Sequence, residues 1–466
     1  MAPFDTSPLV QEFKGDVVTP EHPGYKEAIA RWAANAERNA KVVAFVKDSQ
    51  DVAAAIKFAR ANGLPIAVRG GGHNVSGASS VDDGLVIDLS RFLNKVTVDP
   101  LKKLAYVGGG AIWEAVDMEG IKHGLATVAG TVNHTGVGGL VLGGGYGWLT
   151  GAHGLAADNV VQATVVTADG SVLTASKEEN EDLYFGIRGA GGNFGVVTEF
   201  VFQLYPQRPT VYAGMLVFAP PALEKLLEVT RKWWDNVGQN EGMLQVTTVA
   251  PDGKPAIVLF VFYNGSEAEG REKYKAFFDV GPVADLTKEI PYGELNGLQN
   301  PMAGHGKSVY WKGVANKHMD YMSIKKAHEK VIEAVGTSKF QAAILYEYFP
   351  LNNVNAVPRN ATAFRREMVN NVLINLTWDR SGQDHTEEAR KISHDIADII
   401  LSPQSDMTKS EILGYGNYDP EASEISSSAV DKVKIAFGEN YPKLQAIKKR
   451  YDPENIFNKW FAIVPA

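Results

Sequence analysis

The residues best suited to chemistry stand in one glycine-rich stretch, Arg69-Gly-Gly-Gly-His73-Asn74. Three consecutive glycines let the backbone turn sharply and come close to a ligand. Backbone N–H groups in such a turn form a concave donor surface that suits phosphate oxygens. Arg69 adds positive charge and His73 adds a reactive imidazole. The stretch therefore indicates a phosphate-bearing ligand beside a nucleophile, and the alternative is a glycine-rich surface turn with an incidental histidine.

Two further glycine clusters occupy residues 130–151 and 188–195. Because glycine costs conformational entropy on folding, we expect these clusters to bring the backbone close to a ligand. None of the clusters completes Gly-x-Gly-x-x-Gly at a strand–helix junction, so a Rossmann dinucleotide site is poorly supported. Gly306-Lys307-Ser308 has the end of a phosphate-binding P-loop, but Pro301 stands where that loop requires glycine. We interpret Lys307 as a solvated residue.

Composition narrows the classes of function. The 466 residues predict two or three domains, and 45% hydrophobic content predicts a large core. A net charge of −8 argues against a nucleic-acid partner. No apolar run approaches the ~20 residues of a membrane span, so no membrane partner is expected. With no cysteine, the chain has no disulfides, thiolate nucleophiles, iron–sulfur clusters or cysteine zinc sites, and we expect no metal.

The compartment stays open at this point. The opening residues show no basic region followed by an apolar one, so no signal peptide is visible. The sequence as given therefore indicates the cytoplasm, and secretion remains the alternative if a signal was removed.

The elements that carry the glycine clusters can be placed by periodicity. A strand at 42–46, a helix at 51–62 and a strand at 66–68 form a β-α-β unit that leads into the turn at residues 69–74. In the first two hundred residues we also expect helices at 25–38 and 111–123, and strands at 84–90, 95–98, 104–107 and 159–170.

After about residue 205 glycine thins out and aromatic residues increase. Amphipathic helices alternate there with strands, which is typical of an antiparallel sheet with helices on one face. The expected helices are 221–238, 266–278, 320–335 and 384–399, and the expected strands are 211–218, 243–249, 256–263, 341–349 and 369–377. A basic helix is expected within residues 440–458. The fold class is α+β.

Taken together, the motifs resemble the FAD-linked oxidases of the vanillyl-alcohol-oxidase/PCMH superfamily, in the berberine-bridge-enzyme-like branch. Each motif alone is weak, but their order along nearly the whole chain is specific. The motifs are residues 69–74, 84–90, 135–147, 154–159, 188–197, 415–418 and 451–457.

The resemblance implies a domain plan and a cofactor. Residues 1–206, with a core at 36–206, would form a PCMH-type FAD-binding domain, residues 207–429 a substrate-binding domain, and residues 430–466 a segment that returns to the FAD domain. His73 would bond covalently to the flavin 8α-methyl group. Many relatives add a cysteine tether, but that position is Val132 here, so only a mono-covalent or a non-covalent FAD is possible.

The matching motifs also imply the residues that hold FAD. Besides His73 and Val132, these are Arg69, Gly70, Gly71, Gly72, Asn74, Ser76, Gly77, Thr135, Gly136, Gly138, Gly139, Gly143, Tyr146, Gly147, Asn159, Val160, Gly192, Asn193, Gly195, Val197, Asn417 and Asn455.

Catalytic roles follow from the same resemblance. Tyr415, with Tyr418 adjacent, would accept the proton of a substrate hydroxyl, assisted by the carboxylate of Glu347. Tyr415 could instead be an aromatic wall residue, and Glu347 could instead pair with Arg365 or Arg366. His134 could stabilise negative charge on reduced flavin, or simply hydrogen-bond to backbone.

The substrate is the least determined feature. Sugar-oxidising relatives commonly carry an aromatic residue where this chain has Val75, which weakens the case for a carbohydrate. Aromatic residues that could still line a groove are Trp311, Tyr346, Tyr348 and Trp378, although residues at strand spacing more often belong to the core. The expected function is an FAD-dependent oxidase of an alcohol, sugar or secondary metabolite that reduces O2 to hydrogen peroxide. The alternatives are a flavin dehydrogenase that reacts poorly with O2 and a non-catalytic flavin- or phosphate-binding protein.

Overall fold

A four-stranded sheet carries the turn at Gly70–Gly72. The computed structural model describes residues 4–366, 368–380, 382–423 and 427–466. The strands of this sheet follow the order β1 (Asp16–Val18), β2 (Val42–Phe45), β4 (Leu85–Asp88) and β3 (Ile66–Arg69). The helix α3 (Ser49–Ala61) begins where the Asp48 carboxylate accepts the N–H groups of Gln50 and Asp51. The expected β-α-β unit is present, and β4 lies between its two strands, parallel to both.

A second, antiparallel sheet carries the other glycine clusters. Its strand order is β5 (Val96–Asp99), β6 (Leu104–Gly108), β10 (Val196–Gln203), β8 (Val160–Val166) and β9 (Val172–Ser176). The helix α4 (Trp113–Ile121) packs on β5 and β6, and α7 (Glu181–Ile187) packs on β9. A short pair, β7 (Leu125–Ala126) with β11 (Tyr205–Pro206), lies beside it.

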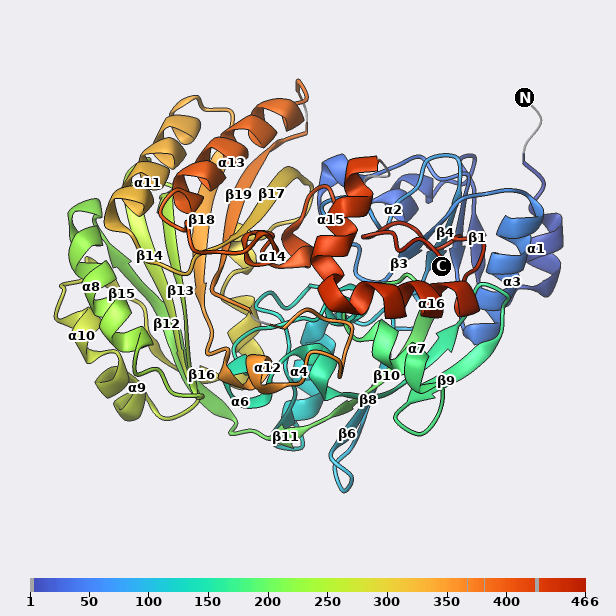
Figure 1. Cartoon of the computed structure of the whole chain (residues 1–466), viewed down its shortest axis with the longest axis horizontal. Coiled ribbons are helices and arrows are strands. Elements are labelled where there is room, and N and C mark those ends of the chain that lie inside the picture. Colours follow the sequence, from blue (N-terminus) through green and yellow to red (C-terminus); the bar gives the residue numbers. More distant parts are fainter. Residues whose placement is uncertain (1–3, 367, 381, 424–426) are drawn as a thin grey trace.

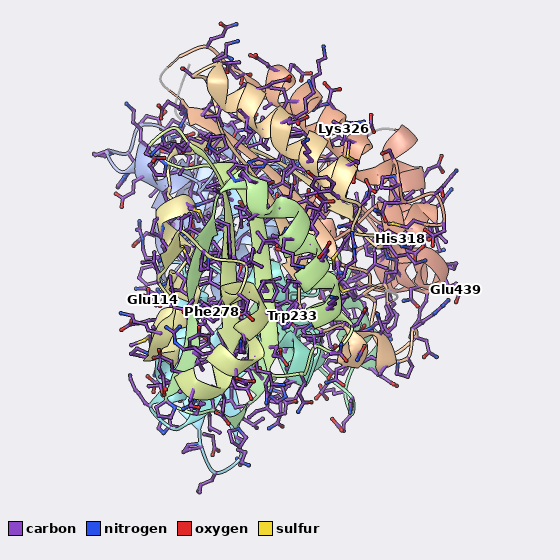
Figure 2. All side chains as sticks on the ribbon, turned by 90° about the vertical axis from the view of Figure 1, so that its left-hand side faces the viewer. Glu114, Trp233, Phe278, His318, Lys326 and Glu439 are labelled. Carbon is purple, nitrogen blue, oxygen red and sulfur yellow. The ribbon has the colours of Figure 1, made fainter. Side chains whose placement is uncertain are left out.

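The largest sheet lies on the other side of the molecule (Figure 1). All its pairings are antiparallel, in the order β15 (Ala284–Asp285), β12 (Thr210–Phe218), β14 (Pro255–Tyr263), β13 (Glu241–Val249), β18 (Gln341–Tyr348), β19 (Asn371–Asp379) and β17 (Lys307–Ala315), with β16 (Lys288–Pro291) also on β12. One face is covered by α8 (Leu223–Trp234), α10 (Lys275–Phe278), α11 (Tyr321–Gly336) and α13 (Thr386–Leu401). Figure 2 views this side, where Trp233 on α8 and Phe278 on α10 are labelled. The α+β fold class is confirmed.

Alternation along the strands splits the large sheet between two cores. Leu244, Phe260 and Phe262 belong to the core shared with the second sheet, whereas Met243 and Val261 belong to the core under the helices. Successive residues of a strand point to opposite faces, so each strand supplies both cores. The face that the helices leave open is thereby directed at the glycine clusters.

The C-terminal helix packs beside the third glycine cluster. The chain ends through α15 (Ser427–Phe437) and α16 (Tyr441–Tyr451), and α16 contacts α7. The buried Lys448 ammonium donates to the carbonyl of Asn193 at 2.8 Å, to that of Phe457 at 2.6 Å and to Asp452 at 2.7 Å. A buried cation needs such full pairing. This contact fixes the turn at Gly192–Asn193, while the division of the chain into the three expected segments stays a prediction.

One expectation about local structure was wrong. The helix expected at 25–38 is only α2 (Tyr25–Ile29) followed by a 3-10 turn, η1 (Ala34–Ala36). Asn35 instead exchanges two hydrogen bonds with the backbone of Val309 in β17, because tertiary pairing outweighs helix propensity here. Lys307 begins β17, and its ammonium lies at the surface, where it pairs with the exposed Asp379, in agreement with the interpretation of a solvated residue.

The remaining elements are short. They are α1 (Ser7–Glu12), α5 (Val137–Leu142), α6 (Thr150–His153), η2 (Ala156–Asn159), η3 (Pro220–Ala222), α9 (Glu267–Lys273), η4 (Tyr292–Gly297), η5 (Asn300–Met302), α12 (Asn352–Ala356), α14 (Lys409–Ile412), η6 (Gly416–Tyr418) and η7 (Gly438–Asn440). Within the described ranges, no helix has both the length and the apolarity to cross a bilayer.

Candidate active site

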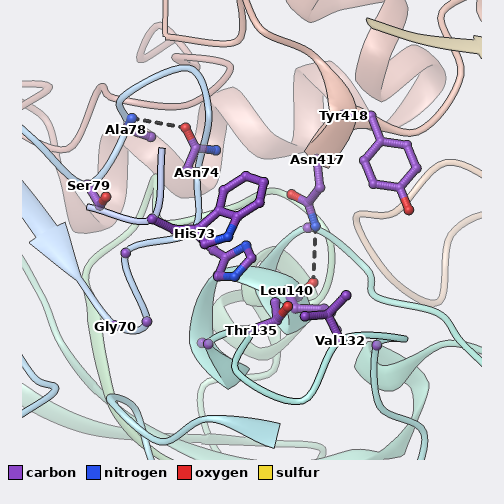
Figure 3. Close-up of a pocket in the computed structure, with 18 of the residues that line it drawn as sticks. Gly70, His73, Asn74, Ala78, Ser79, Val132, Thr135, Leu140, Asn417 and Tyr418 are labelled. Carbon is purple, nitrogen blue, oxygen red and sulfur yellow. Dashed lines mark hydrogen bonds between the residues drawn. The ribbon is translucent and has the colours of Figure 1, made fainter. Parts of the chain in front are cut away.

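A cavity of about 430 Å³ lies between the glycine clusters and the open face of the large sheet. This volume is in the range of small-molecule and cofactor sites. Its walls come from the turn after β3, from α5, from the turn before β10, and from strands β17, β18 and β19. Figure 3 shows Gly70, His73 and Asn74 together with Asn417 and Tyr418 around this space.

The glycines of the cavity do two different things. A Cβ atom on Gly71 would lie 2.5 Å from the Cα of Gly136, so the first two clusters pack backbone against backbone. A Cβ on Gly139 or Gly192 would meet nothing within 4 Å, and both residues line the cavity. These two positions leave open a space that any side chain would fill. An elongated ligand held against bare backbone, as FAD requires, fits this cradle.

A buried hydroxyl supports the same fit. Ser79 lines the cavity, and among the described residues its Oγ atom has no hydrogen-bond partner. A buried polar atom without a partner is costly, so such an atom on a cavity wall points to a polar ligand. The pyrophosphate and ribose oxygens of FAD are ligands of that kind.

His73 is held by two aromatic rings. Its Nε2 lies 2.8 Å from Nδ1 of His134. The Trp32 ring stacks on it at a centroid distance of 4.4 Å and an angle of 11°. Trp32 is held in turn, because its Nε1 donates to the carbonyl of Ala303 at 2.8 Å. His305 lies next to this group, with its ring centroid 4.7 Å from that of His134. These contacts hold the imidazole of His73 in one orientation.

The electrostatics of this histidine cluster favour neutral rings. Burial lowers the pKa of His73 well below its usual value, and His134 and His305, both cations when protonated, lower it further. Burial also lowers the pKa of His134. At neutral pH, His73 therefore keeps a lone pair for nucleophilic attack.

A buried carboxyl marks another part of the cavity wall. The hydroxyl of Tyr418 donates to Oε1 of Glu347 at 2.8 Å, and the hydroxyl of Tyr146 donates to Oε2. Tyr146 also accepts the side-chain amide of Asn371 at 3.0 Å. Burial raises the pKa of Glu347 to about 7, although both tyrosine hydrogen bonds oppose that rise. A carboxyl with this pKa can exchange protons at neutral pH.

Tyr415 is placed differently from its neighbour. Its hydroxyl oxygen accepts the N–H of Gly145 at 3.0 Å and the side-chain amide of Asn417 at 2.7 Å. Burial raises the pKa of its phenol. Tyr415 lines the cavity, but it is Tyr418 that donates to Glu347. The geometry favours Tyr418 as the proton-transfer partner of Glu347, and the roles assigned to these residues stay predictions.

The alternative pairing of Glu347 with an arginine was wrong. Arg366 pairs with Asp158 at 2.6 Å, and Arg365 donates to the carbonyl of Gly414 at 3.1 Å. Both arginines are therefore engaged elsewhere, and Glu347 is held by uncharged hydroxyls alone among the hydrogen bonds described.

Strand alternation decides which residues of the large sheet reach the cavity. In β18 the cavity residues are Gln341, Ala343, Leu345 and Glu347. The intervening Tyr346 and Tyr348, like Trp378 of β19, belong to the core under the helices, which was the alternative to a groove for residues at strand spacing. Trp311 of β17 does line the cavity. Val75 does not, because it is buried against Trp32 and Val309.

Most of the predicted site residues meet at the cavity. The predicted residues that line it are Gly70, Gly71, Gly72, His73, Asn74, Val132, Thr135, Gly136, Gly138, Gly139, Gly143, Tyr146, Gly192, Asn193, Gly195, Val197, Glu347, Tyr415, Asn417 and Tyr418. Asn417 reaches across to donate to the carbonyl of Leu140 at 3.3 Å (Figure 3).

The other predicted residues lie behind this wall. They are Arg69, Ser76, Gly77, His134, Gly147, Asn159, Val160 and Asn455. Arg69 pairs with the buried Asp88 at 3.1 Å, and Asn159 donates to the carbonyl of Leu155 at 2.7 Å. His134 hydrogen-bonds to a side chain, His73, so it is not only a histidine satisfied by backbone.

Two cavity residues were not found from the sequence. Trp32 lies where a helix was expected, and its contact with His73 comes from a turn that only tertiary structure creates. His305 precedes Gly306, in a segment whose sequence resembles only the end of a P-loop. The sequence around neither residue contains a motif that would predict its place at the cavity.

The cavity thus combines a two-part glycine cradle with the open side of an antiparallel sheet, and it has a histidine at one wall and a buried carboxyl at another. This arrangement fits an FAD-linked oxidoreductase. Comparison with known proteins supports the same class. Residues 40–176 match the family described as "FAD binding domain", and residues 415–463 match "Berberine and berberine like".

The relatives extend over the whole chain. The FAD-linked oxidoreductase pgmH of Aspergillus terreus is 34% identical, over 99% of this chain and 96% of its own length. The crystal structure of 6-hydroxy-D-nicotine oxidase from Arthrobacter nicotinovorans superposes with a TM-score of 0.89 at 28% identity, covering 99% of this chain and 100% of that one. Glucooligosaccharide oxidase from Acremonium strictum, with a 6-S-cysteinyl, 8α-N1-histidyl FAD, shares the fold at TM-score 0.84 and 21% identity, covering 98% of each chain.

The chain belongs to the FAD-linked oxidoreductases of the berberine-bridge-enzyme-like branch of the PCMH superfamily. It is an oxidoreductase, and its cofactor is FAD.

Proposed function

We propose that the protein is an oxidase that removes a hydride from an alcohol, sugar or secondary metabolite and reduces O2 to hydrogen peroxide. Bound FAD would take the hydride at flavin N5 and deliver the electrons to O2. The observation that carries the proposal is the buried carboxyl of Glu347, held between the hydroxyls of Tyr146 and Tyr418 on the cavity wall.

The residues of this group have the arrangement that alcohol oxidation needs. A carbon that loses a hydride must have its hydroxyl deprotonated in the same reaction. Tyr418 can receive that proton on its oxygen while it passes its own proton to Oε1 of Glu347, 2.8 Å away. Since burial brings the pKa of Glu347 to about 7, the carboxylate is available as the final acceptor near neutral pH.

The cofactor would be held by one covalent bond, through His73. The oligosaccharide oxidase with the same fold carries its flavin on a histidine and a cysteine. Val132 stands where a cysteine would be needed here, and the chain contains no cysteine at all. The proposal is therefore a mono-covalent FAD, retained at its other end by the glycine cradle.

We call the cavity wall formed by strands β17, β18 and β19 the lid side. Its residues favour a small organic substrate with both apolar and polar parts. Leu345 and Leu373 supply apolar surface near Glu347, whereas Asn375, Thr377 and Trp311 supply polar or aromatic contacts further along β17 and β19. Because a solved relative is named as a 6-hydroxy-D-nicotine oxidase, hydroxylated heteroaromatic amines join alcohols, sugars and phenolic metabolites as candidates.

A peroxide-release screen tests the function. Purified protein should be yellow and should release hydrogen peroxide in air with at least one member of these compound classes. The same compounds are then offered without O2 and with an artificial electron acceptor. Turnover with the acceptor and no peroxide in air would favour the dehydrogenase instead. Colourless protein that takes up no FAD would contradict both.

A further inference from the structure

We propose that His134 accepts the proton that His73 must lose when its ring bonds to the flavin, so that the two imidazoles together build the tether. This inference rests on the proposed tether through His73. It gives His134 a role in cofactor attachment, in place of a contact with the flavin during turnover.

The hydrogen bond between the rings decides which nitrogen can react. Nε2 of His73 and Nδ1 of His134 are 2.8 Å apart, so one proton lies between them. If His73 carries that proton on Nε2, its Nδ1 has a free lone pair. His134 then presents the lone pair of its own Nδ1 as the acceptor. Nδ1 of His73 is therefore the nitrogen available for the covalent bond.

The geometry is held from both sides. Trp32 fixes the plane of the His73 ring through a stack of 4.4 Å. The residues next to His134 are bound through their backbones, since Asn133 donates to the carbonyl of Asn296 at 2.8 Å and the carbonyl of Thr135 accepts the N–H of Trp113 at 3.1 Å. These contacts hold both rings in position, so the pair is preorganised for proton transfer.

The bond-forming step balances with this acceptor. A bond forms between Nδ1 of His73 and the 8α carbon, and one C–H bond of the methyl group is broken. One proton leaves the methyl group and one leaves Nε2 of His73, while two electrons pass to the ring system. Dioxygen, the oxidant of the proposed reaction, removes those two electrons and takes up two protons as hydrogen peroxide.

Without an acceptor the attacking ring would become a cation in a place that opposes one. Burial and the two neighbouring imidazoles already disfavour a charged His73. Transfer to His134 moves the charge to a ring that is only half-buried. The proton is thereby moved from the cavity wall toward solvent.

The test separates the position of His134 from its ability to take a proton. In His134→Asn the side-chain oxygen can still accept the hydrogen bond from His73, but it cannot hold the proton. The full-length chain is produced in riboflavin-limited cells and supplied with FAD in air, and acid-stable flavin is followed with time. Peptide mass spectrometry assigns the flavin to the peptide that contains His73.

The proposal predicts that His134→Asn binds FAD but forms the tether about 100-fold more slowly, the usual size of a lost general base. His305→Gln is the matched control, because it removes an imidazole of the same cluster and leaves the His73–His134 hydrogen bond. It should attach flavin at nearly the original rate. In His134→Ala, added free imidazole should restore the rate, which a purely structural defect would not allow.

The outcomes are distinct. Attachment at the original rate in His134→Asn, equal slowing in His305→Gln, or no rescue of His134→Ala by imidazole would each overturn the role of His134 and leave the tether through His73 intact. If the unsubstituted protein carries no acid-stable flavin, the tether and this inference both fall, and the oxidase assignment is still tested by peroxide release.

Discussion

The histidine cluster and the carboxyl group of the same cavity respond to burial in opposite directions. Burial lowers the pKa of His73 and raises that of Glu347 to about 7, and in both cases it favours the uncharged form. The partners differ as well. His73 has an acceptor imidazole, whereas Glu347 has two hydroxyl donors. One wall is thus arranged to make a nucleophile, and the other to accept a proton.

The comparison also separates the two kinds of structure that build the cavity. On the FAD side, the glycine clusters contribute mainly backbone, and the close contact of Gly71 with Gly136 excludes side chains. On the lid side, strands β17–β19 contribute a side chain at every second position. The first arrangement suits one fixed cofactor, and the second can vary its contacts with little change to the backbone.

The largest expected effect comes from removing the nucleophile. His73→Ala should lose covalent flavin completely, because no other residue is proposed to form the bond, while the cradle still binds FAD reversibly. Acid precipitation followed by flavin absorbance of the pellet measures the bound fraction. Flavin that stays in the pellet would show that the tether is elsewhere.

Removing the carboxyl should affect turnover but not attachment. Glu347→Gln keeps the size of the side chain but cannot accept the proton, so kcat/KM should fall by about 10²–10⁴. The covalent flavin content should be unchanged. In the unsubstituted protein, kcat/KM should rise with pH through about 7 as Glu347 ionises, and this rise should be absent in the variant. An identical pH profile in both proteins would exclude Glu347 as the base.

The opposite pKa shifts should also appear in stability. Glu347 ionises near 4.5 when unfolded and near 7 when folded, so its ionisation destabilises the fold by up to about 3 kcal/mol as pH rises through that window. The pKa of His73 is lower in the folded protein than in the unfolded chain. The stability that the neutral ring contributes to the fold is therefore present above the usual pKa of 6.5 and is lost as the pH falls. When the pH is raised from 5 to 8, the free energy of unfolding of Glu347→Gln should increase relative to that of the unsubstituted protein. That of His73→Gln should decrease relative to the same reference.

Urea unfolding of the three apoproteins at both pH values measures these differences. The unsubstituted protein is the common reference, so the pH dependence of all other groups cancels. If the free energies of unfolding of the two variants change in the same direction with pH, relative to the unsubstituted protein, the opposite pKa shifts of Glu347 and His73 are contradicted.

The sequence predicted the FAD side far better than the lid side, for a physical reason. A glycine that must meet another backbone cannot be replaced, so Gly71 and Gly136 remain visible as motif positions. The stack of Trp32 on His73 and the approach of His305 depend on β17, an edge strand that the sequence did not reveal. For Tyr346 and Tyr348 the sequence left both the groove and the core open, because their face depends on the strand's register, which periodicity alone does not fix.

The smallest predicted effect distinguishes two adjacent tyrosines. Tyr418→Phe removes a donor to Glu347 and the oxygen proposed to receive the substrate proton, so kcat/KM should fall about 100-fold or more. Tyr415→Phe removes only an acceptor for the Gly145 N–H and the Asn417 amide. At about 1 kcal/mol per hydrogen bond, the two bonds correspond to a loss in kcat/KM of at most about 30-fold. The two aromatic rings are kept in both variants, so packing is matched. Steady-state kinetics with one substrate compares them, and a larger loss in Tyr415→Phe would return the role of base to Tyr415.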